Sequence, residues 1–234
     1  MSCWWCHNSE SQKPSIEQIE KKVKMSDNKE LIVKEIIGRK MIVREGYIQG
    51  VGIGTLTDSL TALKYHVFDK KSITMVEFLK ALEKNFEGHE EFRYKLVYET
   101  PKYGNDEDFA DSITRKIFEL YFSAIDGRPN TKGGHYRINL LPTTVYVYFG
   151  SVIVATPDGR KAFEPLSEGI SPVQGVDIKD PTAVLKSATK LDHVRIGGTL
   201  LNQKFTPAFL ATKEGRQNIA QLIRSYFKMG GHHI

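Results

Sequence analysis

The stretch GYIQGVGIGTLTDSLTALKYHVFDK, residues 46–70, places three closely spaced glycines before a helical repeat. The apolar residues Leu56, Leu60, Leu63 and Val67 recur at helical spacing, which predicts an amphipathic helix with this stripe turned inward. Glycines 50, 52 and 54 suggest a dinucleotide-binding turn, but no strand of adequate length precedes them and the third glycine falls too early for G-x-G-x-x-G. We therefore interpret them as positions that allow a tight backbone approach before a helix.

Two further helices are expected downstream. Thr74 and Glu77 have the spacing of a capping box, and residues 101–125 begin with an acidic first turn for which Asn105 or Asp106 is the expected N-cap. Apolar spacing predicts one buried stripe for each helix: Val76, Leu79, Leu82 and Phe86 in the first, and Phe109, Ile113, Ile117, Leu120 and Ala124 in the second.

The pattern changes after these helices. RINLLPTTVYVYFGSVIVATPDGRK, residues 137–161, is β-branched and aromatic, and predicts a strand, a second short strand and a P-D-G turn with solvated charges. Residues 181–191 predict a helix with Pro181 in its first turn, and residues 197–205 predict a strand. Residues 213–229 predict a last helix that ends at a left-handed Gly230, with these residues inward: Ile219, Leu222, Ile223 and Tyr226. The chain is therefore expected to be α/β, with more helices than strands.

Composition excludes several classes of protein. The chain has 234 residues, 40% of them hydrophobic and 26% charged, as in an ordinary globular protein. No apolar run approaches the roughly 20 residues of a membrane-spanning helix, and no secretion signal is recognised at the N-terminus. The net charge of +5 is scattered, which argues against nucleic-acid binding. Two cysteines form no disulfide framework, and we expect a cytoplasmic location.

Several phrases, in this order and spacing, resemble the glycyl radical enzymes, the family of pyruvate formate-lyase and B12-independent glycerol dehydratase. The resemblance covers residues 46–234 and rests on these phrases: GVGIGTLTDSLTALKYHVFD, FLKALEKNFEGHEEFR, PKYGNDEDFAD, ATPDGRKAFEPLSEGISPVQGVD, PTAVLKSATKLDH, GTLLNQKF and IRSYFKMGGHHI. It implies an incomplete slice of a ten-stranded α/β barrel whose relatives act on small metabolites. The segments SPVQG and GTLLNQKF resemble the dehydratase and lyase branch of the family more than pyruvate formate-lyase itself.

The resemblance also implies two radical carriers. Members of the family have a cysteine in a G-C-x-E-type loop inside the barrel and a radical-bearing glycine in an R-V-x-G-Y-type loop. This sequence has no cysteine after Cys6 and no R-V-x-G-Y. We therefore expect the chain alone to be inactive and to hold no cofactor, and assign it no catalytic residue.

The N-terminal CWWCHNSESQ, residues 3–12, resembles a different protein, the radical S-adenosylmethionine activase that installs the glycyl radical. In that family a C-x-x-x-C-x-x-C motif holds a [4Fe–4S] cluster, and Cys3 and Cys6 match its second and third cysteines. Two thiolates do not complete such a cluster. A zinc site would need two further ligands. Residues 1–45 are therefore interpreted as a poorly ordered activase remnant, and residues 46–234 as a partial glycyl radical domain.

The resemblance places LLPTTVYVYFG, residues 140–150, near the substrate of the barrel. This segment is expected to be a strand in which alternation puts Thr144, Tyr146 and Tyr148 on one face, where the hydroxyls of Thr144 and Tyr146 would orient a polyol or similar molecule. The alternative is a strand whose polar face packs against helices. The loop GISPVQG, residues 169–175, is expected near the same site, whereas His193 is interpreted as a structural histidine.

Two hypotheses for the function stay open. The chain is either an inactive fragment of a formate acetyltransferase or a glycerol or diol dehydratase-like lyase, or it is a piece of a split enzyme or a module that binds a complete relative. The expected partners are other pieces of such an enzyme or its activase. Strand edges left unpaired would also favour self-association.

Overall fold

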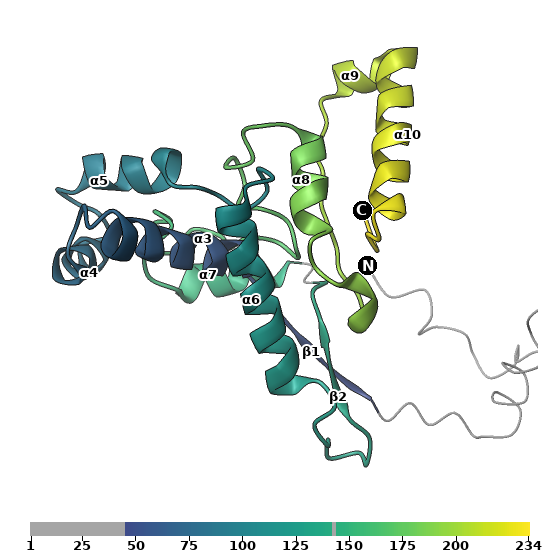
Figure 1. Ribbon diagram of the computed structural model, residues 1–234, viewed down its shortest axis with the longest axis horizontal. Helices are drawn as coiled ribbons and strands as arrows, with labels where there is room; N and C mark the ends of the chain where they lie inside the picture. Colours follow the sequence, from purple (N-terminus) through teal and green to yellow (C-terminus); the bar gives the residue numbers. More distant parts are fainter. Residues whose placement is uncertain (1–44, 142–143) are drawn as a thin grey trace, which may run out of the picture. The chain divides into compact units, whose positions relative to one another are not determined.

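The computed structural model describes residues 45–141 and 144–234, which form a helix-rich α/β unit around a short parallel sheet (Figure 1). The elements follow the chain in this order: β1 (Gly46–Gln49), α3 (Ile53–Leu63), the π-helical η3 (Lys64–Asp69), α4 (Met75–Glu83), α5 (Glu90–Tyr94), the π-helical η4 (Lys95–Glu99), α6 (Asp108–Ile125), β2 (Tyr136–Asn139), α7 (Val145–Val152), α8 (Pro181–Ala188), the 3₁₀-helical η5 (His193–Arg195), α9 (Pro207–Ala211) and α10 (Lys213–Lys228). No helix in the described ranges is long and apolar enough to cross a membrane.

Strands β1 and β2 pair in parallel, with Gly46 opposite Tyr136 and Gln49 opposite Asn139. A tight turn cannot join parallel strands, so the chain between them makes a long crossover that contains α3 and α6. Figure 1 shows the two strands side by side, with α6 beside them. Ile138 is fully buried on the face that packs against the apolar core.

A third extended segment continues the sheet beyond β2. Leu140 bridges Thr199 in parallel, and the Leu200 amide donates to the Leu140 carbonyl at 3.1 Å. On its other side the Leu201 amide donates to the His233 carbonyl at 3.1 Å. The strand predicted for residues 197–205 is thus reduced to a short paired segment, because the Asn202 amide turns away from the sheet to the Ser171 hydroxyl.

The main apolar core lies between the sheet and its covering helices. Its largest fully buried side chains come from α6, α8, α10, β2 and the segments that flank them: Phe118, Ile138, Leu140, Ile170, Val184, Leu185, Leu201 and Tyr226. A second, smaller core joins α3 to α4 and includes Ala62, Phe78, Ala81, Phe86 and Leu96. These two cores hold the described unit together.

The glycine turn after β1 confirms the tight-approach interpretation. Gly52 has a φ of +79°, and a Cβ on Gly54 would lie 2.8 Å from the Ser171 carbonyl oxygen. The strand β1, which the sequence pattern did not indicate, leads directly into this turn. The turn lets α3 start against the loop that contains Ser167 and Ser171.

The predicted stripe of α3 is confirmed only in its second half, since Leu63 and the following Val67 pack against the second core, and much of the buried face is polar. Thr57, Asp58 and Thr61 are buried, whereas Leu56 and Leu60 of the predicted stripe are 47% and 41% exposed. The helix is therefore turned away from the orientation that its apolar residues favour. Hydrogen bonds to other segments hold it there, among them that from the Thr55 amide to the Ser167 hydroxyl at 3.0 Å.

The predicted stripes of α4 and α6 are also exposed in part. In α4, Val76 and Leu79 are exposed while Phe78 and Ala81 are buried, although the predicted capping box of Thr74 and Glu77 is confirmed. In α6, Leu120 is 70% exposed. Its buried face instead carries Asp111, which accepts from Lys190 Nζ at 2.6 Å and from the Ser187 hydroxyl at 3.1 Å.

The predicted N-cap of α6 is wrong. The helix begins after Glu107, whose side chain makes no capping hydrogen bond. Asn105 fastens residues 176–179 instead: its amide nitrogen donates to the Val176 carbonyl at 2.8 Å, and its side-chain oxygen accepts from the Ile178 amide at 2.9 Å.

The strand predicted within residues 137–150 is confirmed only as β2, and residues 145–152 form the helix α7 instead. β-branched and aromatic residues favour strands weakly, and tertiary packing overrides them. Gly150 of α7 packs so closely on the following loop that a Cβ there would lie 2.4 Å from the Glu164 carbonyl oxygen. The second short strand is absent from the described ranges. The Arg160 guanidinium donates to the carbonyls of Ile153 and Val154, so these carbonyls do not pair with another strand.

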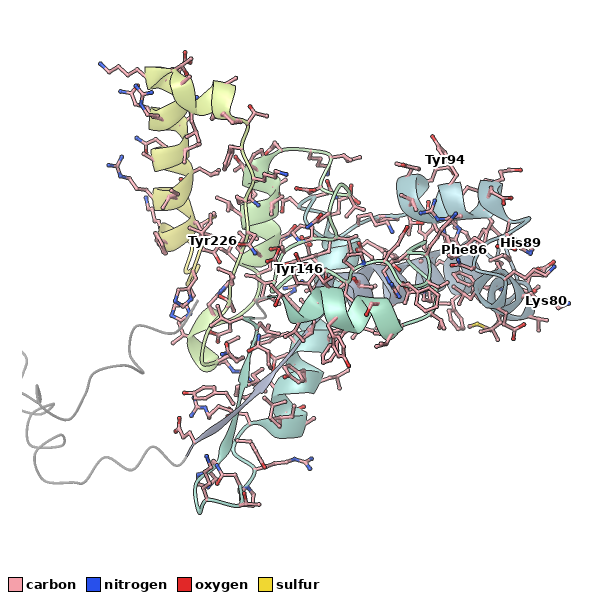
Figure 2. All side chains as sticks on the ribbon, turned by 180° about the vertical axis from the view of Figure 1, so that it is seen from behind. Lys80, Phe86, His89, Tyr94, Tyr146 and Tyr226 are labelled. Atoms are coloured by element: carbon pink, nitrogen blue, oxygen red, sulfur yellow. The ribbon has the colours of Figure 1, made fainter. Side chains whose placement is uncertain are left out.

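Two of the helices after α7, α8 and α10, agree with the sequence. Pro181 is in the first turn of α8, and the Asp180 side chain caps that helix by accepting from the Ala183 amide at 2.9 Å. α10 ends at Gly230, which has a φ of +92°. Tyr226 is fully buried near this end (Figure 2), whereas Ile223, also predicted inward, is exposed.

Replacing Gly169 by alanine tests how the loop at residues 167–176 is held on the sheet. Gly169 has a φ of +55°, and a Cβ there would lie 2.3 Å from the Leu200 carbonyl oxygen. We expect Gly169→Ala to lower the free energy of unfolding by at least about 2 kcal/mol in urea denaturation, from backbone strain and the clash. Gly175→Ala is the matched control, since Gly175 has a φ of +83° but open space around it, and should cost only about 1 kcal/mol. Equal losses would contradict this account.

Candidate functional site

The carboxyl ends of the parallel strands form the first candidate site, since ligands of open parallel sheets bind at that edge. Gln49 and Asn139 are the last residues of β1 and β2 and lie directly opposite each other. The Gln49 Nε2 and Asn139 Oδ1 atoms are both buried and have no hydrogen-bond partner among the described residues. This end of the sheet thus buries one unsatisfied donor on β1 and one unsatisfied acceptor on β2, which are groups that a neutral hydroxylated ligand can satisfy.

The loop GISPVQG lies beside the third extended segment of the sheet, whereas its expected contact with a substrate stays a prediction. The Ile170 amide donates to the Leu200 carbonyl at 3.1 Å, and the Ile170 carbonyl accepts from the Tyr103 hydroxyl at 2.8 Å. Between this loop and residues 202–204 lies a cavity of about 590 Å³, with Ser171 and Asn202 in its wall. Hydrogen bonds therefore hold this loop in place, and it forms one wall of the cavity.

Thr144 and Tyr146 do not share the face of a strand. Thr144 directly precedes the helix α7, and Tyr146 lies within it. Thr144 is exposed, and Tyr146 is half-buried (Figure 2). In a helix, residues two apart point about 200° apart. The alternation argument for these two hydroxyls is wrong, and their contact with substrate stays a prediction.

The predicted cysteine pair, Cys3 and Cys6, lies outside the described residues. Within the described ranges, no group of three or more His, Cys, Asp or Glu side chains is arranged to hold a metal ion. His193 is buried and has two structural partners, the Thr199 hydroxyl at 2.6 Å and the Ala188 carbonyl at 2.9 Å. Burial lowers its pKa, so the ring is held neutral between these partners.

A second concentration of polar groups is buried beneath α3. Asp58 Oδ1 accepts from the Tyr103 amide at 2.9 Å, while Oδ2 has no partner among the described residues. Burial raises the pKa of Asp58 to about 7, and the positive charge of Lys102 only partly opposes this. A carboxyl group that titrates near neutral pH is thus enclosed in the fold.

The P-D-G turn is confirmed, but its charges are not solvated as predicted. Asp158 and Arg160 are both buried. Asp158 Oδ1 accepts from the Thr156 hydroxyl at 2.5 Å, and the Lys102 ammonium donates to the Asp158 carbonyl at 3.0 Å. The sequence pattern missed this cluster, because residues 58, 102 and 158 meet only in the folded chain.

Two family descriptions match the chain. Pyruvate formate lyase-like matches residues 2–150, and Glycine radical matches residues 166–234. Among curated proteins, trans-4-hydroxy-L-proline dehydratase of Clostridioides difficile is 55% identical over 188 residues, which are 80% of this chain and 24% of that enzyme. Isethionate sulfite-lyase of Nitratidesulfovibrio vulgaris is 40% identical over 194 residues, 81% of this chain and 23% of that enzyme.

Solved structures agree with these matches. Hydroxyproline dehydratase from Clostridioides difficile with trans-4-hydroxy-L-proline bound has a TM-score of 0.79 and 54% identity, covering 81% of this chain and 24% of that one. The B12-independent glycerol dehydratase from Clostridium butyricum, with glycerol bound, has a TM-score of 0.77 and 43% identity at the same coverage. The chain spans about a quarter of the length of the curated relatives it matches.

The buried carboxyl of Asp58 predicts a stability that depends on pH. Its pKa is raised from an ordinary value near 3.8 to about 7 in the folded chain, so the folded state holds the proton more tightly than the unfolded state. This contribution is complete below about pH 4 and is lost as the pH rises through 7, by an amount on the order of 4 kcal/mol. We expect the free energy of unfolding in urea to fall over this interval.

The variant Asp58→Asn isolates the effect, because the amide keeps the acceptor for the Tyr103 amide and does not titrate. Its stability curve between pH 4 and 8 should lack the Asp58 contribution, and the variant should be more stable than the natural chain at pH 8. Parallel curves for the two proteins would contradict the assignment.

Proposed function

The chain belongs to the glycyl radical enzyme family, and from that premise we propose that it supplies one wall of the substrate-enclosing barrel of a dehydratase. The observation that carries the proposal is its 55% identity to trans-4-hydroxy-L-proline dehydratase over 188 residues. Relatives named as acting on glycerol and on 1,2-propanediol share the fold. Their common chemistry is the dehydration of a small hydroxylated molecule, which we assign to the barrel that this wall completes.

In this proposal the sheet edge holds the substrate. The buried amides of Gln49 and Asn139 supply a donor and an acceptor without charge, and leaving them unpaired costs about 1–3 kcal/mol each. A substrate hydroxyl that pairs with both recovers this cost. The hydroxyls of Thr144 and Tyr146 remain candidates for further contacts from the α7 region.

Catalysis in this proposal needs groups from outside the matched residues. The resemblance assigns hydrogen abstraction to a cysteine and a radical glycine, and this sequence has no cysteine after Cys6 and no R-V-x-G-Y. We therefore infer that the chain alone is inactive and that the remainder of the barrel, activated by a radical S-adenosylmethionine enzyme, is its partner. The activase-like interpretation of residues 1–45 and a cytoplasmic location belong to the same proposal.

The exposed apolar stripes support this partner. Leu56 and Leu60 on α3, Val76 and Leu79 on α4, and Val147 and Val152 on α7 are all exposed. Water-exposed stripes of this kind mark surfaces that another part of a protein covers. A parallel strand such as β1 also normally has neighbours on both sides and helices on both faces.

A chimera tests the proposal. Residues 46–234 replace the matching segment of trans-4-hydroxy-L-proline dehydratase, and the protein is activated anaerobically. We expect a glycyl radical in electron paramagnetic resonance and dehydration of trans-4-hydroxy-L-proline, whereas the chain alone with the activase gives neither. A folded chimera that carries the radical but dehydrates no hydroxylated substrate would contradict the proposal.

Within the active chimera, Gln49→Leu and Asn139→Leu should each lower kcat/KM about tenfold or more, with an unchanged radical yield, since each removes one hydrogen bond to substrate. Gln221→Leu on the exposed face of α10 is the matched control and should leave kcat/KM unchanged. Equal kinetics in all three variants would remove Gln49 and Asn139 from the substrate site.

A further inference from the structure

A second cavity of about 390 Å³ shares the loop residue Gln174 with the cavity at the sheet edge and is rich in positive charge. Arg93 at the end of α5, Lys102, and Arg160 after the P-D-G turn all line it. Lys102 and Arg160 are each only 6% exposed. Long cationic side chains are almost never this deeply buried unless a negative group compensates them.

The hydrogen bonds of these cations go to neutral atoms. Arg93 Nε donates to the Gly159 carbonyl at 2.8 Å, and the Lys102 ammonium donates to the Asp158 carbonyl at 3.0 Å. The Arg160 guanidinium donates to the Thr156 hydroxyl and to the carbonyls of Ile153, Val154 and Glu164. Within residues 45–141 and 144–234, no carboxylate lies within ion-pair distance of any of the three.

The two carboxylates that line the cavity have other hydrogen-bond partners. Asp158 Oδ1 accepts from the Thr156 hydroxyl, and Glu164 Oε2 accepts from the Lys161 amide at 3.0 Å. Burial lowers the pKa of the Arg160 guanidinium, and the charges of Asp158 and Glu164 only oppose this shift. The positive charge in the cavity is therefore incompletely compensated by the described side chains.

We propose that this cavity binds a small oxyanion, such as phosphate or a short carboxylate, through Arg93 and Lys102. The two terminal nitrogens of Arg93 make no hydrogen bond to the described residues, and Lys102 uses one of its three donors. A guanidinium grips an oxyanion with two parallel hydrogen bonds, and an ammonium adds a point charge. The volume lies within the range of small-molecule sites.

This site differs in chemistry from the proposed substrate edge, although Gln174 lines both cavities. The edge presents neutral amides and lies at the carboxyl ends of the strands, whereas the cavity presents cations beside α5 and the P-D-G turn. An anion held there would join Arg93, Lys102 and the P-D-G turn. It would therefore stabilise the contact between these three segments.

The test is the effect of phosphate and of acetate on the full chain, each compared with sodium chloride at equal ionic strength. We expect calorimetry to give a dissociation constant of about 1 mM or below for at least one oxyanion, and Tm to rise by about 3 °C at ten times that concentration. Phosphate and acetate distinguish the two sources of oxyanion. If sodium chloride raises Tm as much as phosphate and acetate do at equal ionic strength, the proposal is overturned.

Matched variants locate the site. Arg93→Met and Lys102→Met should each weaken binding at least about tenfold, while Arg224→Met and Lys228→Met remove the same charges from the exposed surface of α10 and should leave binding unchanged. If Lys102→Met does not fold, the variants of the half-buried Arg93 test the site instead. We expect Arg93→Lys to bind the oxyanion more tightly than Arg93→Met, because it keeps the positive charge. Unchanged binding in Arg93→Met, or equal weakening in Arg224→Met, would overturn the proposal.

Discussion

The parallel pairing of β1 with β2, and of Leu140 with Thr199, is the constraint on which the rest of the described structure depends. Parallel neighbours cannot be joined by tight turns, so each pairing closes a long segment of chain. The helices in those segments are thereby brought against one sheet and bury Phe118, Ile138 and Leu185 together. The entropic cost of closing such loops grows only slowly with their length, and the buried apolar area offsets it.

The interior beneath α3 is held by polar contacts as well as by the apolar residues Ile53, Ala62 and Leu63. Thr57, Asp58 and Thr61 face inward, and a buried polar group costs free energy unless it finds a partner. Two partners come from distant parts of the chain: Tyr103 for Asp58 Oδ1, and Ser167 for Thr55. The hydroxyls of Thr57 and Thr61 have no hydrogen-bond partner among the described residues. Since the bonds of Asp58 and Thr55 form in one arrangement only, they specify how α3 lies on its neighbours.

The described unit presents two polar environments of different character. The sheet edge offers unsatisfied neutral amides, which suit a hydroxylated substrate of the kind that the named relatives dehydrate. The second cavity offers incompletely compensated cations, which suit an oxyanion. The exposed apolar residues of α3, α4 and α7 form a third surface. Each surface has its own chemistry.

The sequence by itself determined the family, the helix-rich α/β class, and the local signals that act over a few residues. The capping box at Thr74, Pro181 in the first turn of α8, and the end of α10 at Gly230 all depend on neighbouring backbone groups, which lie close in any fold. Only the tertiary structure decided the helix at α7 and the inward face of α3, because packing outweighs intrinsic preference there. It likewise decided that Gln49 lies opposite Asn139, through the pairing of β1 with β2, and that Lys102 and Arg160 line one cavity, since residues so far apart in the chain come together only in the folded protein.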